Sequence, residues 1–112
     1  MSQTDTRTSL LDAVAAQAKA ELAPLVQVID QGHYPGEYMH HLGALGGFGA
    51  GIPAELGGQG LDLATQIEAT TLVGQECGST AFLVWCQSSC AWYLLHSPNE
   101  AVRNRYLARV SK

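Results

Sequence analysis

Residues 46–60 read GGFGAGIPAELGGQG, and this run of glycines interrupts the regular structure predicted on both sides of it. Eight of the 12 glycines of the protein lie between residues 43 and 60, together with one proline, Pro53. Glycine accepts a positive φ angle or a close backbone approach without a steric penalty. The stretch therefore predicts a tightly packed loop between helical segments.

The spacing of these glycines invites comparison with a loop that binds the phosphates of a dinucleotide. Such a loop needs the pattern G-x-G-x-x-G, a preceding strand and a following acidic residue. Ile52 stands where the third glycine would be required, and no strand is predicted before Gly46. A Walker-type ending with Gly-Lys-Ser/Thr is also missing from the sequence. The pattern favours a structural loop.

Helical periodicity surrounds the loop. Before it, apolar residues recur every three or four positions from Leu10 to Ile29, with an expected break at Pro24 and a stop at Gly32. The predicted helices cover residues 10–31, 36–45, 63–78, 80–96 and 100–109. No stretch alternates convincingly with period two, as a half-buried strand would. The sequence predicts an all-α fold, a helical bundle of about five helices.

The extent of the domain and its inward faces follow from the same spacing. Residues 1–9 lack apolar periodicity and are predicted as a flexible N-terminus, with residues 10–112 as one helical domain. The side chains expected to point inward on the helices over 63–78 and 100–109 are Ile67, Thr71, Val73, Val102, Tyr106 and Val110.

The helix over 80–96 is apolar on nearly all sides and is predicted to be central and buried. The aromatic residues expected in its core contacts are Phe82, Trp85, Trp92 and Tyr93. Cys86 and Cys90, one turn apart, are expected as small core residues rather than as a redox pair. Residues 87–89, Gln-Ser-Ser, interrupt the apolar surface, and buried polar groups need partners. Those partners are expected in a neighbouring subdomain or a ligand.

Composition argues against several classes of protein. The chain has 112 residues, 46% of them hydrophobic, and a formal net charge of −4 at pH 7. Basic residues are few and mostly near the C-terminal end, so nucleic-acid binding is not expected. No stretch is long and apolar enough to span a membrane, and no export signal is seen. Three cysteines in such a chain indicate a reduced, cytoplasmic protein.

Three residues have the spacing of metal ligands. His33, Glu37 and His41 follow one another at four-residue steps, which on one helix would align them. Pro35 and Gly36 make a continuous helix there improbable, so no metal site is predicted.

The segments around the glycine loop have a more specific pattern. Residues 32–35, Gly-His-Tyr-Pro, precede a short predicted helix, and residues 52–60, IPAELGGQG, follow it. This arrangement resembles the N-terminal domain of acyl-CoA dehydrogenases, in which a short helix leads into G-[IV]-x-x-P-E-E-[YF]-G-G-x-G. Leu56 replaces the usual aromatic residue. Residues 75–79 and 99–107 are similar to later parts of that domain, so the resemblance covers about residues 10 to 110.

The resemblance implies an oxidoreductase that uses FAD to introduce an α,β double bond into an acyl-CoA thioester. Family members are several times longer, and their flavin β-domain and C-terminal helical domain with the catalytic glutamate follow this segment. The chain is therefore expected to hold no catalytic residue, to leave FAD binding mainly to regions it lacks, and to be inactive alone. The full-length protein is expected to be a homo-oligomer.

Two other functions stay open at this point. Some relatives are flavin-dependent monooxygenases acting on small organosulfur or aromatic substrates, and these do not need the downstream glutamate. A non-catalytic, truncated helical module is the other alternative.

The resemblance also implies that the helix over 80–96 lines the cavity for the acyl chain. The substrate-binding residues expected from it are Phe82, Trp85, Cys86 and Ser89, which share one helical face. Core packing is the alternative role for these four. Trp85 is bulky enough to shorten or reshape the cavity, which would favour short or non-linear acyl groups, or a substrate that is not a thioester.

Overall fold

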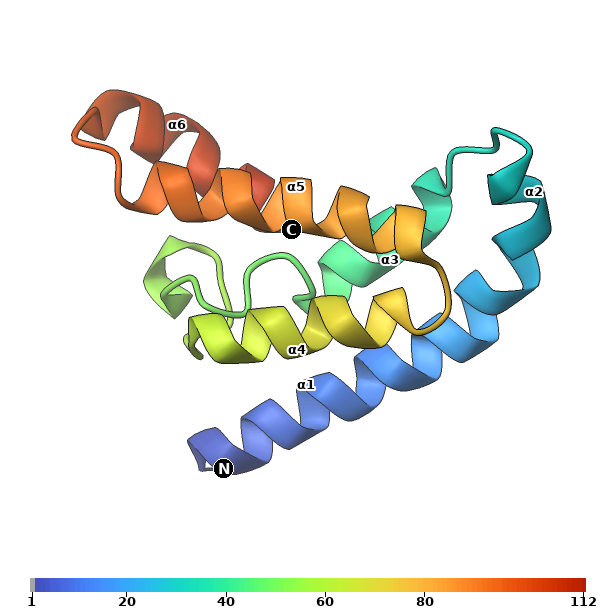
Figure 1. Ribbon diagram of the computed structural model, residues 1–112. Coiled ribbons are helices and arrows are strands. Elements are labelled where there is room, and N and C mark those ends of the chain that lie inside the picture. The colour runs from blue at the N-terminus through green and yellow to red at the C-terminus, as the bar shows by residue number, and fades with distance from the viewer. Residues whose placement is uncertain (1) are drawn as a thin grey trace.

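The helices of the protein begin and end close to the capping and breaking residues of its sequence. The computed structural model describes residues 2–112 (Figure 1). Its α-helices are α1 (Gln3–Gln17), α2 (Val26–Asp30), α3 (Gly36–Leu45), α4 (Leu63–Gly74), α5 (Gly78–Leu95) and α6 (Glu100–Val110). No strand occurs within this described part of the chain, and the predicted all-α fold is confirmed.

Helix α1 begins at Gln3, well before its predicted start. The hydroxyl of Ser2 caps it by accepting a hydrogen bond from the Asp5 N–H at 3.1 Å. The predicted helix start at residue 10 is therefore wrong, since residues 3–9 are helical, while Met1 lies outside the described residues. The first turns of α1 are polar, so no apolar stripe marked them in the sequence.

Pro24 breaks the regular helix, as predicted. The backbone forms a π-helical segment over Ala18–Leu22 and a 3-10 turn over Ala23–Leu25 before α2 continues. Proline has no N–H for the bond to the carbonyl four residues earlier, so the hydrogen-bonding pattern must change near it. The segment from α1 to α2 is thus one distorted helical unit, and with α3 to α6 it makes up the predicted set of about five.

Four helices lie side by side in the order α1, α4, α5, α6 (Figure 1). The molecule is flat, with principal extents of 41 × 32 × 18 Å. The fully buried leucine and valine side chains of the main core come from α1, the π-helical segment, α3, α4 and α5: Val14, Leu22, Leu42, Val73 and Val84. A smaller cluster of Ile52, Ala91 and Leu107 joins the glycine loop to α5 and α6.

Helix α5 lies between α4 and α6, as predicted for a central helix, but it is not buried on all sides, so the prediction of a buried helix is wrong. Its buried residues are Thr80, Val84, Ser88 and Ala91, which lie on one face. On the other side Phe82, Trp85 and Tyr93 are 60%, 53% and 70% exposed. Cys86 and Cys90 are exposed as well, so they are not core residues. In so thin a molecule, nothing within the described residues covers the outer face of this helix.

The predicted inward faces of α4 and α6 are only partly right. Val73 is fully buried and Val110 packs against the cluster of Leu107, as predicted, but Ile67, Thr71 and Tyr106 are exposed. Helix α4 buries Thr65, Gln66, Ala69 and Val73, whereas Ile67 is 59% exposed and Thr71 is exposed. Helix α6 buries Leu107, and its neighbour Tyr106 is 38% exposed. Successive residues point about 100° apart around a helix, so an error of one position changes the buried face.

The glycine-rich segment is a loop, as predicted, and its residues 46–50 are all buried. Gly58 shows why a side chain is not tolerated there: a Cβ atom on it would lie 2.1 Å from the carbonyl oxygen of Ile52. The loop is closed by its own backbone, since the Gly60 N–H donates to the same Ile52 oxygen at 2.9 Å. Close backbone approach therefore accounts for glycine at this position.

Candidate functional site

A cavity of about 710 Å³ lies where α4, α5 and the glycine loop meet. Its volume falls in the range of known small-molecule sites, about 300–1,000 Å³. On the α5 side its lining is mainly aromatic, with Trp85, Trp92 and Tyr93. The α4 side contributes Ile67, Thr70, Thr71 and Gln75, and the loop contributes Phe48, Gly51 and Ile52. The arrangement suits a ligand with a compact apolar part.

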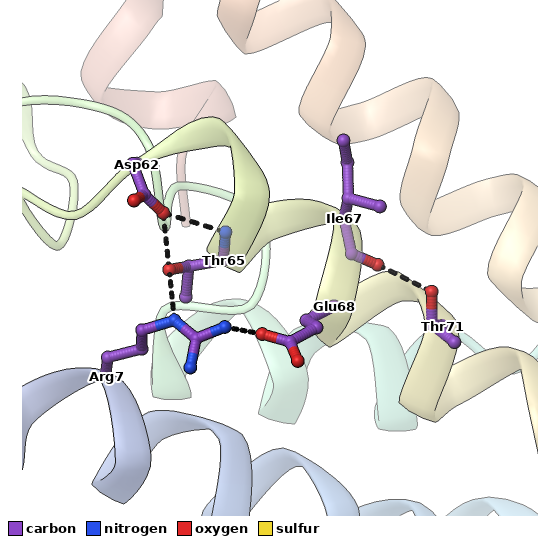
Figure 2. Close-up of polar contacts among 6 residues, drawn as sticks. All are labelled: Arg7, Asp62, Thr65, Ile67, Glu68 and Thr71. Atoms are coloured by element: carbon purple, nitrogen blue, oxygen red, sulfur yellow. Dashed lines mark hydrogen bonds and ion pairs between the residues drawn. The ribbon is translucent and has the colours of Figure 1, made fainter. Parts of the chain in front are cut away.

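The threonines on the α4 wall use their hydroxyl donors inside the helix. Thr70 Oγ1 donates to the carbonyl oxygen of Gln66 at 2.9 Å, and Thr71 Oγ1 donates to that of Ile67 at 2.9 Å (Figure 2 shows the second). A threonine hydroxyl that donates to the preceding turn in this way does not need a further acceptor in its surroundings. The α4 wall is therefore only weakly polar despite its threonines.

Polar contacts with α1 hold the beginning of this wall in place (Figure 2). Asp62 caps α4, because its Oδ1 accepts hydrogen bonds from the Thr65 N–H at 2.9 Å and the Thr65 hydroxyl at 2.6 Å. These bonds lower the pKa of the Asp62 carboxyl below its ordinary value. Arg7 donates from Nε to Thr65 Oγ1 at 3.1 Å and forms an ion pair with Glu68. Helix α1 thereby orients α4.

The four predicted substrate-binding residues do not all reach the cavity. Trp85 and Ser89 line it. Trp85, Cys86 and Ser89 also line a second, more open hollow of about 470 Å³ on the outer side of α5. Phe82 lines neither, although its ring centroid lies 5.6 Å from that of Trp85. The structure thus brings three of the four together, and their role in binding stays a prediction.

Two of the three polar residues that interrupt α5 have partners in the domain itself. Gln87 Nε2 donates to the carbonyl oxygen of Val110 at 2.8 Å, which ties α5 to the end of α6. Ser88 Oγ donates to the carbonyl oxygen of Trp85 at 3.2 Å. Ser89 is half-buried and lies on the cavity wall. Of the three polar residues, only Ser89 is therefore still expected to find its polar partner in a ligand.

Sequence reasoning missed the α4 and loop sides of the cavity. Ile67 and Thr71, one helical turn apart, were assigned to the core because they fit an apolar period. In the fold they face the cavity, with Ile67 left largely exposed. An isoleucine on a largely polar side of α4 was the one sequence feature that could have indicated a binding surface. Its spacing, however, is the same as that of a core residue.

Two further groups, which lie away from the cavity, have shifted pKa values. Burial raises the pKa of the Cys77 thiol, but hydrogen bonds from Ser79 and Thr80 outweigh burial and leave that pKa below its ordinary value. Burial, helped by Glu21 and then Cys77, raises the pKa of Tyr38 to about 12. Neither Cys77 nor Tyr38 lines the cavity.

Several backbone amides of the glycine-rich segment are engaged in hydrogen bonds within the domain. The Ala50 N–H donates to Gln66 Oε1 at 3.1 Å. The N–H groups of Gln59 and Leu61 donate to the carbonyl oxygens of Gly49 and Ala50, each at 2.9 Å. A phosphate-binding loop needs such amides free to point at the anion.

Across residues 2–112, no three or more His, Cys, Asp and Glu side chains gather where they could hold a metal ion. Of the histidine pair considered above, His41 lies with Nδ1 2.5 Å from Glu21 Oε1. None of the helices in this described range is long and apolar enough to cross a membrane.

Comparison with known proteins identifies the family. Residues 4–112 match the model of the acyl-CoA dehydrogenase N-terminal domain. The chain belongs to the acyl-CoA dehydrogenase family. The match covers nearly the whole sequence and confirms the resemblance drawn from the glycine-rich segment.

Two known dehydrogenases are similar in sequence to this acyl-CoA dehydrogenase domain. The chain is 28% identical over 107 residues to the cyclohex-1-ene-1-carbonyl-CoA dehydrogenase of Syntrophus aciditrophicus (strain SB), covering 95% of the chain and 26% of that protein. It is 30% identical over 86 residues to the mitochondrial short-chain specific acyl-CoA dehydrogenase of Homo sapiens, covering 76% of the chain and 21% of that protein. The chain thus spans about a quarter of the length of these relatives. No solved structure matches it.

Proposed function

We propose that this domain forms one side of the acyl pocket of a flavin-dependent acyl-CoA dehydrogenase, which makes an α,β double bond in an acyl-CoA thioester. The observation that carries the proposal is the cavity of about 710 Å³ between α4 and α5, found in a chain of this family. Its largely apolar lining suits an acyl group better than the charged CoA moiety. The two named relatives act, by their names, on a cyclic and on short acyl groups.

The preferred substrate is a short or ring-shaped acyl thioester. Three large aromatic side chains, Trp85, Trp92 and Tyr93, occupy the α5 side and limit how far a linear chain can extend. Aromatic surfaces also pack well against flat apolar rings.

The catalytic base and most contacts to FAD belong to regions beyond this domain. When bound, FAD accepts the hydride that leaves the substrate. Glu68 and Glu76 of this chain form ion pairs rather than acting as the base. Glu68 pairs with Arg7, and Glu76 Oε1 lies 3.6 Å from Lys19 Nζ. This domain contributes shape and water exclusion rather than chemistry. Homo-oligomerisation of the full-length protein and a cytoplasmic location are part of the same proposal.

Calorimetric titration of the chain with acyl-CoAs tests the proposal. We expect butanoyl-CoA and cyclohexanecarbonyl-CoA to bind more tightly than CoA, and dodecanoyl-CoA to gain nothing over butanoyl-CoA. Trp85→Ala should tighten dodecanoyl-CoA binding about tenfold, because burying two more methylenes contributes about 1.6 kcal/mol. Phe82→Ala is the matched control, since Phe82 is a neighbouring aromatic residue that does not line the cavity.

Two results would contradict the proposal. Equal affinity for CoA and for every acyl-CoA would exclude an acyl pocket in this domain. Tight binding of small aromatic or organosulfur compounds without any binding of acyl-CoA would favour the flavin-dependent monooxygenase instead.

A further inference from the structure

The loop wall and the helix wall of the cavity are joined by one buried side chain, that of Gln66. It lies early in α4 and is 6% exposed. Its Oε1 accepts a hydrogen bond from the Ala50 N–H at 3.1 Å, and its Nε2 donates to the carbonyl oxygen of Gly47 at 2.8 Å. One amide therefore satisfies a donor and an acceptor of the loop together, whereas an ionised carboxylate can only accept.

These two bonds bracket the part of the loop that lines the cavity. Phe48 lies between the bonded residues Gly47 and Ala50, and Ile52 follows shortly after. Of the other backbone bonds of this segment, some join the loop to itself, as from the Gln59 N–H to the oxygen of Gly49. The N–H groups of Gly46 and Gly47 donate to oxygens at the end of α3. Gln66 also lines the cavity. The amide thus attaches the loop wall of the cavity to the α4 wall.

Loss of the amide would leave two buried backbone groups without partners. Gly47 and Ala50 are both buried, and an unpaired buried donor or acceptor is costly enough to make the segment move toward water. Such a movement carries Phe48 and Ile52 away from α4 and widens the cavity. The width between the walls decides how thick an acyl group can enter.

We infer that Gln66 is a positioning residue that sets the thickness of acyl group accepted by the cavity, by holding residues 47–50 of the loop against α4. The inference rests on the proposed acyl-binding function and adds a selection for thin or flat acyl groups over branched ones. Gln66 touches the cavity, but its effect on selectivity acts through the loop.

The test compares two ligands and one amide proton. The dissociation constants of 2,2-dimethylbutanoyl-CoA and butanoyl-CoA are measured by calorimetry, and hydrogen exchange of the Ala50 amide by NMR. In the wild type we expect the branched ligand to bind at least tenfold more weakly and the Ala50 amide to be protected. Gln66→Met, which keeps the length but not the amide, should remove most of that discrimination and speed Ala50 exchange at least tenfold. Thr71→Val is the control, because it removes a cavity-lining hydroxyl bonded only within α4.

The variant Gln66→Glu separates positioning from a merely structural role. A protonated carboxyl can still accept from the Ala50 N–H and donate to the oxygen of Gly47, whereas an ionised one repels that oxygen. Its discrimination should therefore be close to that of the wild type at low pH and be lost as the carboxyl ionises. This variant also decides the matter if Gln66→Met does not fold.

The outcomes distinguish the two proposals. If the wild type binds acyl-CoA no better than CoA, the acyl-binding function fails and the inference with it. If the wild type binds acyl-CoA but discrimination is unchanged in Gln66→Met while Ala50 exchange accelerates, only the inference on Gln66 is overturned. If a folded Gln66→Glu variant discriminates between the two ligands equally at every pH, the inference on Gln66 is overturned too.

Discussion

Asp62 and Thr65 join two helices through a small set of atoms. Asp62 caps α4 through Thr65, and Thr65 in turn accepts from Arg7 of α1 (Figure 2). Thr65 is fully buried although it is polar, because each of its polar contacts is satisfied there. The cavity wall therefore depends on individual hydrogen bonds as well as on apolar packing.

This capping predicts a pH dependence of stability. The pKa of Asp62 is lower in the folded state than its ordinary value of 3.8, mainly through the hydrogen bonds of Thr65. The stabilisation is fully present above the unfolded-state pKa and is lost as the pH falls through the folded-state pKa. In Asp62→Asn the capping oxygen remains but does not titrate. We therefore expect the stability of the wild type to fall more steeply than that of Asp62→Asn below about pH 4.

Urea unfolding at pH steps between about 2 and 7 measures this difference. The variant Asp12→Asn removes an exposed carboxyl of α1 and controls for the change in net charge. Parallel pH profiles for the wild type and Asp62→Asn would show that the cap does not contribute to acid sensitivity.

Each outer helix has one buried stripe that decides how it packs. Helix α6 contacts α5 through Leu107, which is 1% exposed and belongs to the cluster with Ile52 and Ala91. Tyr106, which the sequence assigned to the inside, instead lies beside Arg105, whose guanidinium carbon is 5.3 Å from the centre of its ring. Adjacent residues on α6 are therefore expected to differ strongly in their contribution to stability.

Truncation of these two neighbours tests the observed face of α6. Leu107→Ala should lower the free energy of unfolding by about 2–5 kcal/mol, because it leaves a cavity in a packed cluster. Tyr106→Ala should lower it by less than about 1 kcal/mol, because Tyr106 is 38% exposed and belongs to neither buried cluster. Urea unfolding of both variants gives the comparison, and a larger loss for Tyr106→Ala would mean that α6 packs in the rotated register.

The molecule as a whole is thin and leaves one face of α5 uncovered within residues 2–112 (Figure 1). Phe82, Trp85 and Tyr93 on that face are each more than half exposed. Contiguous apolar surface of this kind is uncommon on a monomer and promotes association. The glycine loop, by contrast, is packed and adds little to this surface, since residues 46–50 are buried.

The 112-residue chain is therefore expected to self-associate through α5 at micromolar concentrations. Phe82→Ser together with Tyr93→Ser should weaken self-association at least tenfold and change the free energy of unfolding by less than about 1 kcal/mol, because both side chains are exposed. Sedimentation equilibrium measures the association. Tyr34→Ser is the control, since Tyr34 is 60% exposed but lies between α2 and α3. Equal association of the double variant and the wild type would place the contact elsewhere.

The order and type of the helices could be read from the sequence because they depend on local residues. Helix α3 occupies the predicted residues 36–45, and the predicted break at Pro24 is present. Caps, prolines and glycines act on the backbone within a few residues of themselves, so their effect needs no knowledge of the fold. The polar first turns of α1, stabilised through Ser2, carried no apolar signal and were missed.

Only the tertiary structure decided which sides of the helices are buried and where the cavity lies. The acyl-CoA dehydrogenase resemblance pointed to α5, and Trp85 and Ser89 do line the cavity, but the opposite wall on α4 was assigned to the core. That wall is held by contacts such as Gln66 with Gly47, 19 residues away, and Arg7 with Thr65, 58 residues away. Such contacts leave no periodic trace in the sequence, because they depend on how distant segments meet after the chain has folded.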